Sequence, residues 1–286
     1  MEEKVTLEGV IDMHVHTNPD LRVRAYNDFE LCDAAVHVGA RAIVIKSHLG
    51  DTVERAIMTN VYNKIVHGEN TFEMFGGIVL NKNIGGINPT AVETGLKLGA
   101  KVIWLPTQSA RNHLVRMKQD LSKSVDVIQD GKIVPELRDV FSLIKEHNAV
   151  LATAHISVDE CFRVVEAAKN YGIEKIVITH PEWSLVGMSI EQQARLVRDY
   201  DVILEHCFAQ PLGGGKYKSN MEENLATIEA CGYKNVMVDT DGGQVENPHW
   251  EIALQQYMQY LFDHGIPRDQ LRYMTQDIAA NLLGIQ

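Results

Sequence analysis

Short apolar runs alternate along this chain with segments whose apolar residues recur every three to four positions. The runs are rich in Val and Ile, a composition typical of parallel strands that are buried on both faces. We predict eight strands, near residues 10–16, 42–48, 75–81, 102–107, 150–157, 176–182, 202–208 and 235–241. The helical periodicity between them predicts eight helices, near residues 28–39, 51–66, 89–98, 136–147, 158–171, 189–199, 219–231 and 250–263.

Eight strands alternating with eight helices predict an α/β fold, a (β/α)8 TIM barrel. The main rival is a doubly wound open sheet, which usually carries a glycine-rich phosphate turn after its first strand. Here the first strand runs instead into a His-Val-His-Thr-Asn-Pro-Asp segment, which offers metal ligands. The barrel is therefore the favoured architecture. The composition contains no linker, so we predict that residues 1–286 form a single domain.

Two further segments need an interpretation. Residues 123–135 interrupt the alternation after the fourth strand, and Asp130-Gly131 within them is a strong signal for a type I′ β-hairpin. This inserted hairpin is either a flap at the catalytic rim or a surface decoration. Gly213-Gly214-Gly215 lacks the strand and helix context of a phosphate loop, and we expect a flexible rim loop there.

Charge and composition narrow the choice of partners and compartment. The formal net charge of −11 argues against nucleic acid or an anionic membrane as the main partner. No apolar run approaches the roughly 20 residues that span a bilayer. The acidic start lacks the basic and apolar regions of a signal peptide, and the four scattered cysteines have no CxxC spacing. We expect a cytoplasmic protein with reduced thiols and a small-molecule substrate; a homo-oligomer is left open.

Four histidines and an aspartate follow four of the predicted strands. They are His14 and His16 on the first strand, His155 after the fifth, His180 after the sixth and Asp241 after the eighth. Residues two apart on a strand point to the same side, so His14 and His16 can share one ion. A barrel brings its strand ends to one rim, where distant residues converge. We therefore predict a metal site formed by these five residues.

Asp239 and Asp241 share one face, and both are candidates for the aspartate of this site. Asp241 is favoured because it ends the strand beside two glycines, where a substrate can approach. A carboxylate there could hold the ion and take a proton from the attacking water. In the alternative, Asp239 is the ligand and Asp241 caps the next helix.

This arrangement resembles the amidohydrolase superfamily, and the resemblance extends along the whole chain. The features that carry it are the HxH on the first strand, the single histidines after the fifth and sixth strands, the aspartate after the eighth, and a tail, residues 275–284, like that superfamily's closing helix. More narrowly, residues 46–48, 76–81, 85–89 and 104–107 look like an uncharacterised branch of it. The resemblance implies that His14, His16, His155, His180 and Asp241 are metal ligands. It also implies that Asp241 is the general acid/base.

The sequence departs from the family pattern at the fourth strand. Many members carry there a carboxylated lysine or a glutamate that bridges two metals, whereas this strand ends in Pro106-Thr107-Gln108. A lysine ends the second strand instead, as Lys46, and we expect it to share a strand face with His48. Lys46 could be carboxylated and bridge two ions, remain a cation that binds substrate, or pair with Asp12 or Asp241. One or two ions are therefore expected.

Several other polar residues are candidates for substrate binding. They are Asn81 and Asn88 beside a glycine-rich loop, Glu205 on the seventh strand, and Arg111, which with Arg22 and Arg24 lies on predicted rim loops. The arginines could clamp a carboxylate, although an ordinary surface position is the alternative for each. For Glu205 and His206 the pattern leaves open which one faces the barrel mouth. The remaining histidines, His113 among them, are expected at the surface.

We expect a metal-dependent hydrolase that attacks an amide, lactam or imide C–N bond, or an ester or lactone. Asp241 would act as the base and then the acid, and Lys46 or His48 would stabilise the oxyanion. Imidazole and carboxylate ligands suit zinc first, then manganese, iron or cobalt. The alternatives are a metal-dependent decarboxylase on the same scaffold and a non-catalytic barrel that binds a metal or a ligand.

Overall fold

The computed structural model describes residues 4–285, so the first three residues of the acidic start and Gln286 lie outside the described residues. Each predicted strand and helix is found. The helix bounds agree with the periodicity to within two residues, whereas most strands are shorter than the apolar runs suggested. None of the helices within residues 4–285 has the length and apolar character needed to cross a membrane.

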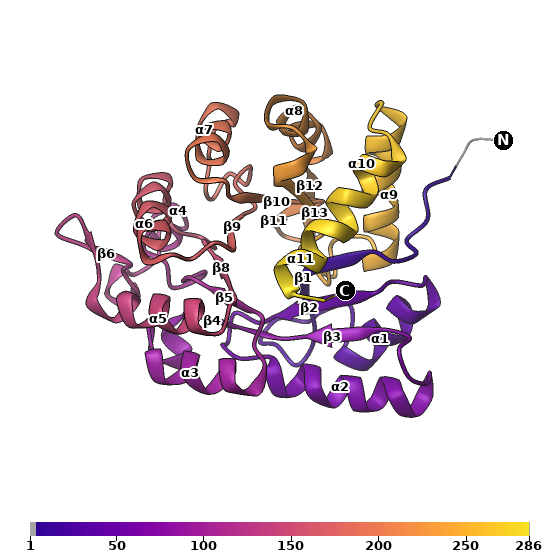
Figure 1. Ribbon diagram of the computed structural model, residues 1–286, viewed down its shortest axis with the longest axis horizontal. Helices are drawn as coiled ribbons and strands as arrows, with labels where there is room; N and C mark the ends of the chain where they lie inside the picture. The colour runs from indigo at the N-terminus through magenta and orange to yellow at the C-terminus, as the bar shows by residue number, and fades with distance from the viewer. Residues whose placement is uncertain (1–3, 286) are drawn as a thin grey trace. The chain divides into compact units, whose positions relative to one another are not determined.

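The chain divides into two compact units. Unit 1 comprises residues 1–46, 54–75 and 206–286, and unit 2 comprises residues 47–53 and 76–205. Unit 1 contains a three-stranded parallel sheet, and unit 2 contains most strands of a second parallel sheet; the strands and helices can be followed by their labels in Figure 1. That the whole chain forms one domain stays a prediction.

Unit 1 is built on the parallel strands β1 to β3. Its elements in chain order are β1 (Ile11–His16), α1 (Asp28–His37), β2 (Ala42–Lys46), α2 (Val53–Val66), β3 (Glu73–Phe75), β11 (Ala209–Gly213), β12 (Lys216–Ser219), α8 (Met221–Cys231), β13 (Val236–Asp239), α9 (Trp250–Asp263), α10 (Arg268–Arg272) and α11 (Ile278–Leu283). The sheet has the order β1-β2-β3, and β13 contacts the free side of β1. Figure 1 shows α1 and α2 together beneath this sheet.

Unit 2 contains five parallel strands in the order β4-β5-β8-β9-β10. Its elements are β4 (Gly77–Val79), α3 (Pro89–Leu98), β5 (Val102–Trp104), α4 (Arg111–Arg116), β6 (Ile128–Gln129), β7 (Lys132–Ile133), α5 (Pro135–Glu146), β8 (Val150–Ala152), α6 (Val158–Tyr171), β9 (Ile176–Thr179), α7 (Ile190–Tyr200) and β10 (Ile203–Cys207), which ends in unit 1. Side chains of these strands form the core of the unit, as the near-complete burial of Ile103, Leu151 and Ile178 shows.

Helix starts in both units follow capping rules that are visible in the sequence. Asn27 with Glu30, Ser157 with Glu160, and Ser189 with Gln192 form reciprocal capping boxes at α1, α6 and α7. Each box satisfies backbone N–H groups that the first turn of a helix leaves without partners. The capping side chains therefore determine the residue at which each of these three helices begins.

Two β-hairpins lie outside the parallel sheets. The hairpin insertion is confirmed as β6 and β7, with Asp130 and Gly131 both at positive φ as a type I′ turn requires, and β7 contacts α6. The loop expected at residues 213–215 is found as the turn of a second antiparallel hairpin, β11–β12, and its flexibility and place at the rim stay predictions. Three consecutive glycines at positive φ supply a tight turn that few other residues could form.

A close approach of two backbones fixes the end of β13 against β1. His16 N–H donates to the Gly242 carbonyl, Gly242 N–H donates to the His14 carbonyl, and Ala25 N–H donates to the Gly243 carbonyl. Gly243 has a φ of +84°, and a Cβ there would overlap the His16 carbonyl oxygen. Only glycine fits this position, so the contact between the strands depends on it.

We predict that Gly243→Ala lowers the free energy of unfolding by at least about 3 kcal/mol, because the added methyl pushes the two backbones apart. Urea denaturation measures the change. Gly213→Ala is the matched control, since Gly213 has a φ of +80° and nothing lies within 4 Å of its added Cβ. A loss in Gly243→Ala no larger than in this control would contradict the proposed overlap.

Candidate metal centre

Unit 1 brings His14, His16 and Asp241 into one buried cluster. The Asp241 Oδ1 atom lies 3.3 Å from His14 Nε2 and 3.1 Å from His16 Nε2. Donor atoms around a tetrahedral ion at about 2.1 Å are roughly 3.4 Å apart. Because all three residues are almost fully buried and their donor atoms have this spacing, the cluster fits one divalent cation.

Local backbone conformation directs Asp241 into the cluster. The strand β13 ends at Asp239, and Asp241 follows at a φ of +47°, in the left-handed region. Asp239 is committed elsewhere, since its Oδ1 accepts the Met13 N–H at 3.0 Å. The structure therefore brings Asp241, and not Asp239, against the imidazoles. A left-handed aspartate costs conformational energy and is typical of functional sites.

Asp12 supports the cluster from behind. Its Oδ1 accepts the His14 N–H at 2.9 Å, and its Oδ2 accepts the Thr240 hydroxyl at 2.6 Å and the Trp250 indole N–H at 2.9 Å. Burial raises the pKa of Asp12 to about 6, although the three donors act in the opposite direction. One carboxylate thus joins β1, the residue before Asp241, and α9.

Protonation in the cluster favours metal binding. Burial, followed by the charge of Arg24, lowers the pKa of His16 to about 3, which leaves a neutral imidazole with a lone pair to donate. Burial works against ionisation of Asp241, but His14, His16 and Lys46 together hold the pKa of this carboxyl well below its usual value. A neutral imidazole beside a carboxylate is the donor set that zinc and manganese accept.

Lys46 lies at the edge of the cluster. It ends β2, is almost fully buried, and its Nζ is 2.9 Å from His14 Nε2. Lys46 therefore competes with an ion for the same nitrogen or joins it as a carbamate. The three roles considered from the sequence, a carboxylated bridge, a substrate-binding cation and an ion pair with Asp12 or Asp241, stay predictions. The prediction that Lys46 and His48 share one strand face is wrong, because β2 ends at Lys46 and His48 lies beyond the strand.

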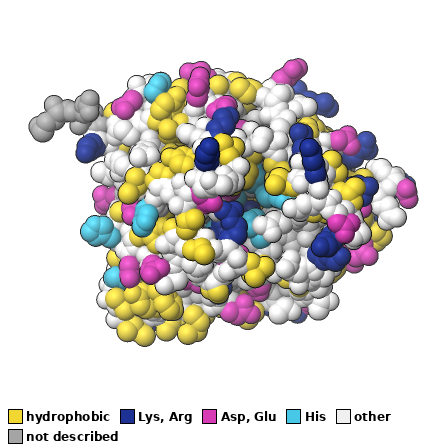
Figure 2. All heavy atoms as spheres, turned by 180° about the vertical axis from the view of Figure 1, so that it is seen from behind, with side chains coloured by type: hydrophobic (Ala, Val, Ile, Leu, Met, Phe, Trp, Pro, Cys, Tyr) yellow, Lys and Arg dark blue, Asp and Glu magenta, His cyan; other side chains and the backbone are white. Residues whose placement is uncertain are grey.

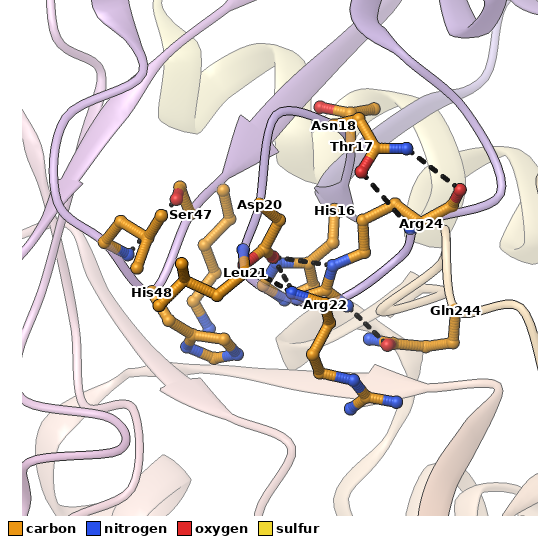
Figure 3. Close-up of polar contacts among 12 residues, drawn as sticks. His16, Thr17, Asn18, Asp20, Leu21, Arg22, Arg24, Ser47, His48 and Gln244 are labelled. Carbon is orange, nitrogen blue, oxygen red and sulfur yellow. Dashed lines mark hydrogen bonds and ion pairs between the residues drawn. The ribbon is translucent and has the colours of Figure 1, made fainter.

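A second cation, Arg24, is buried in the loop that follows β1 (Figure 3). Its Nε donates to Asp20 at 2.7 Å, and its Nη1 donates to Gln244. Asn18 holds the loop in shape through reciprocal bonds with the Arg24 backbone, of 3.0 and 3.3 Å. The charge of Arg24 interacts with both His16 and Asp241, so the loop adds positive potential beside the cluster.

Unit 2 contains its own group of aromatic and imidazole rings. His155 and His180 lie beyond β8 and β9, with ring centroids 5.1 Å apart, and His180 has a φ of +28°. Trp183 stacks on His180 at 4.1 Å. The Trp183 indole nitrogen is buried, and no group in residues 4–285 accepts its hydrogen bond. A buried donor of this kind suits an oxygen atom of a ligand.

His113 is a site residue that sequence reasoning missed. It was expected at the surface, but it lies half-buried at α4, and its Nδ1 is 2.9 Å from His155 Nδ1. The two rings stack at 5.1 Å, and burial lowers the pKa of His113. If His155 donates its Nδ1 proton here, its Nε2 carries the lone pair that a metal ligand needs. The helix α4 was not predicted, so no sequence signal indicated this contact.

Asn81 acts as a structural clamp for the neighbouring loops. Its amide donates to the His48 carbonyl at 2.9 Å and to the Thr107 hydroxyl at 2.6 Å, and its oxygen accepts the Thr107 and Ser109 N–H groups. The Thr107 hydroxyl also bonds His48 Nδ1 at 2.9 Å. Asn81 therefore positions His48, and its expected contact with substrate is not supported.

The other residues expected to bind substrate differ in burial and in their hydrogen-bond partners. Asn88 caps α3 by accepting the Ala91 N–H, and Arg111 is half-exposed and 3.7 Å from Asp126; that either binds substrate stays a prediction. Glu205 is buried on β10. The His206 ring forms a hydrogen bond with Asn224 of α8. Because side chains alternate along a strand, Glu205 points to the opposite face of β10. The sequence pattern had left open which way each of these two side chains points.

Comparisons with known proteins bear on the fold. The model of a family of unknown function, DUF6282, matches residues 9–205, and no curated protein matches the chain. Many solved structures match, and three of them illustrate a likeness across nearly the whole chain. The first is an amidohydrolase from Pseudomonas aeruginosa, with 10% sequence identity over 96% of this chain and 95% of that one and a TM-score of 0.65. The second is a candidate 2-pyrone-4,6-dicarboxylic acid hydrolase from Pseudomonas putida, with 18% identity over 98% of each chain and a TM-score of 0.58. The third is a dihydroxybenzoic acid decarboxylase from a Polaromonas species with bound manganese and an inhibitor, 2-nitroresorcinol, with 11% identity over 97% of each chain and a TM-score of 0.57.

At these identities the likeness concerns the fold. The expected (β/α)8 fold is confirmed, and the resemblance to amidohydrolase proteins is one of fold. The relatives include both hydrolases and decarboxylases, so the reaction does not follow from the comparison.

We predict that Asp12→Asn lowers the free energy of unfolding by about 1–3 kcal/mol, because either orientation of the amide turns an N–H group toward a buried donor. Urea denaturation provides the measurement. The exposed Asp269→Asn serves as the control and should change stability by less than about 0.5 kcal/mol. Equal stability of the two variants would show that the bonds to Asp12 are dispensable.

Proposed function

We propose that this chain, which belongs to the family of unknown function DUF6282, is a metal-dependent enzyme of the amidohydrolase type that acts on a small molecule. The observation that carries the proposal is the contact of Asp241 Oδ1 with both His14 Nε2 and His16 Nε2. Its spacing suits a single ion, and its three residues are those that the sequence pattern selected. The manganese bound by the related decarboxylase supports a divalent metal.

The proposed ligand set is His14, His16, His155, His180 and Asp241. Of these five, His14, His16 and Asp241 form the buried cluster described above. Zinc is the first candidate for the ion, with manganese, iron or cobalt as alternatives. When bound, such an ion would polarise a substrate carbonyl and lower the pKa of a water toward about 7.

The protein's own groups would perform the proton transfers. Asp241 is ionised at neutral pH, since its pKa is held low, and it can take a proton from water and return it to the leaving group. Lys46, with its ammonium nitrogen beside His14, is suited to stabilise a developing oxyanion. His48 is the alternative for this role. The unpaired indole N–H of Trp183 could orient a substrate oxygen.

Hydrolysis of a C–N bond in an amide, lactam or imide is the reaction that we favour, with an ester or lactone next. One observation supports a decarboxylase as the second candidate. Arg24 is a buried guanidinium that is ion-paired with Asp20 and whose charge also interacts with Asp241 and His16, and such a guanidinium could bind a substrate carboxylate as a second anion. Under either reaction we expect the substrate to carry a carboxylate.

Metal content provides the first test of the proposal. We expect about one Zn²⁺ or Mn²⁺ per chain in the parent protein, and a loss of affinity of at least about tenfold in His16→Gln and Asp241→Asn. Elemental analysis after equilibrium dialysis measures both. His147→Gln, at an exposed position, should bind as the parent does. A parent protein that retains no metal in excess Zn²⁺ or Mn²⁺ would eliminate the proposed centre.

The same measurement separates the roles of Lys46. We expect the ion to survive in Lys46→Met, which removes the amine and keeps most of the side-chain volume. Two ions in the parent that fall to one or none in Lys46→Met would instead identify a carboxylated lysine that bridges two metals.

The reaction class is tested on metal-loaded protein with two panels of aromatic and cyclic carboxylic acids. Carbon dioxide release reports decarboxylation, and ring opening of lactones, lactams and imides reports hydrolysis. We predict that Arg24→Met raises KM for the active carboxylate at least about tenfold, because the paired cation is lost.

Arg22→Met is the matched control, since Arg22 lies in the same loop but is nearly half-exposed and pairs with Glu246. It should leave KM within about twofold. An unchanged KM in Arg24→Met would remove the carboxylate from the proposal. Absence of turnover in every metal form would favour the non-catalytic alternative.

A further inference from the structure

The outward face of α2 is unusually apolar for a surface helix. Its exposed side chains include Ile57, Met58, Val61 and Ile65, and Ile65 is 78% exposed. Figure 2 shows hydrophobic side chains gathered over this helix at the lower left of the molecule. Isolated exposed apolar residues are common on proteins, but a continuous stripe of them indicates a surface that binds a partner.

An apolar groove lies beside the same helix, at its N-terminal half. Its volume is about 530 Å³, and its walls include Pro19, Phe29, Met58 and the stem of Arg55. The exposed Phe29 ring is held in place by stacking on Tyr62 at 4.6 Å, and Arg55 is fixed by its bonds to Asp28 at 2.7 and 2.9 Å. These contacts keep the groove formed in the absence of a partner.

The protruding side chain and the groove lie at opposite ends of one helix. Ile65 is seven residues beyond Met58, which is roughly 10 Å along the axis. If two copies of α2 pack antiparallel about a twofold axis, the Ile65 side chain of each copy meets the groove of the other. This surface is therefore complementary to itself, which is the condition for a twofold interface.

The charges on this face have the same antiparallel complementarity. Glu54 and Lys64 are the charged residues among its exposed positions, one near each end of the stripe. In an antiparallel pair each Glu54 opposes Lys64 of the other copy. Within one copy Lys64 is paired with Glu69, and both side chains are about two-thirds exposed. Because an exposed ion pair contributes little free energy, Lys64 can leave Glu69 for Glu54 of the other copy at a small free-energy cost.

We infer that α2 is the interface of a homodimer, in which two copies pack this helix antiparallel about a twofold axis. The apolar stripe and the groove residues beside it form one continuous apolar surface, and a stable complex buries roughly 800 Å² of each partner. A second copy fits better than another partner, because the complementary shape and charge both come from this chain. The inference does not depend on the proposed function.

Sedimentation velocity over a concentration series tests the interface on the full-length protein. We expect the parent to be a dimer, and Ile65→Glu and Met58→Glu to weaken association at least about 30-fold each. Ile252→Glu, on α9, is the matched control, since Ile252 is 47% exposed and lies outside the stripe. It should dimerise as the parent does. A monomeric parent, or a dimer unaffected by Ile65→Glu, overturns the inference.

Reversing the charges of Glu54 and Lys64 tests the antiparallel register. A surface that associates non-specifically through apolar contacts would have no such register. We expect Glu54→Lys and Lys64→Glu each to weaken the dimer at least about fivefold, because each variant opposes like charges. The double variant should recover association to within about threefold of the parent. Thermal unfolding of every variant confirms that its fold is retained. A double variant that is weaker than both single variants contradicts the register.

Discussion

The pairing of β1 with residues 239–243 is the constraint on which the candidate centre depends. Backbone hydrogen bonds link His14 and His16 to Gly242, and Gly243 permits an approach that a side chain would prevent. The Asp12 carboxylate locks the same junction from behind. As a result Asp241 has little freedom, and its oxygen is held against two imidazoles before any ion is bound. Such preorganisation lowers the entropic cost of binding a metal.

Strain and charge are concentrated around this junction. Asp241 follows its strand in the left-handed conformation, which disfavours residues other than glycine and needs support from the surrounding fold. Burial keeps His16 neutral, while Lys46 and Arg24 bring positive charge beside the carboxylate. A buried cluster of two imidazoles and one carboxylate, with two basic side chains beside it, is poorly suited to structural packing alone. It is well suited to a metal and an anionic ligand.

The sequence predicted the order of elements and the ligand types because both rest on local patterns. Apolar runs specify strands, capping residues specify helix starts, and the HxH spacing specifies a shared face. It could not predict features that arise from backbone geometry or tertiary contact. His113 contacts His155 through a short helix with no strong periodicity, and Asn81 is consumed by loop contacts that its position alone does not reveal. The left-handed Asp241 likewise decided the choice over Asp239 only once the turn was seen.

The central claim is that a divalent ion binds between His14, His16 and Asp241. Crystals of the metal-loaded protein, measured on both sides of the zinc or manganese absorption edge, test it most directly. We expect an anomalous peak about 2.0–2.2 Å from His14 Nε2, His16 Nε2 and an Asp241 oxygen. Full occupancy at another cluster of side chains, with no peak at these three residues, would contradict the account.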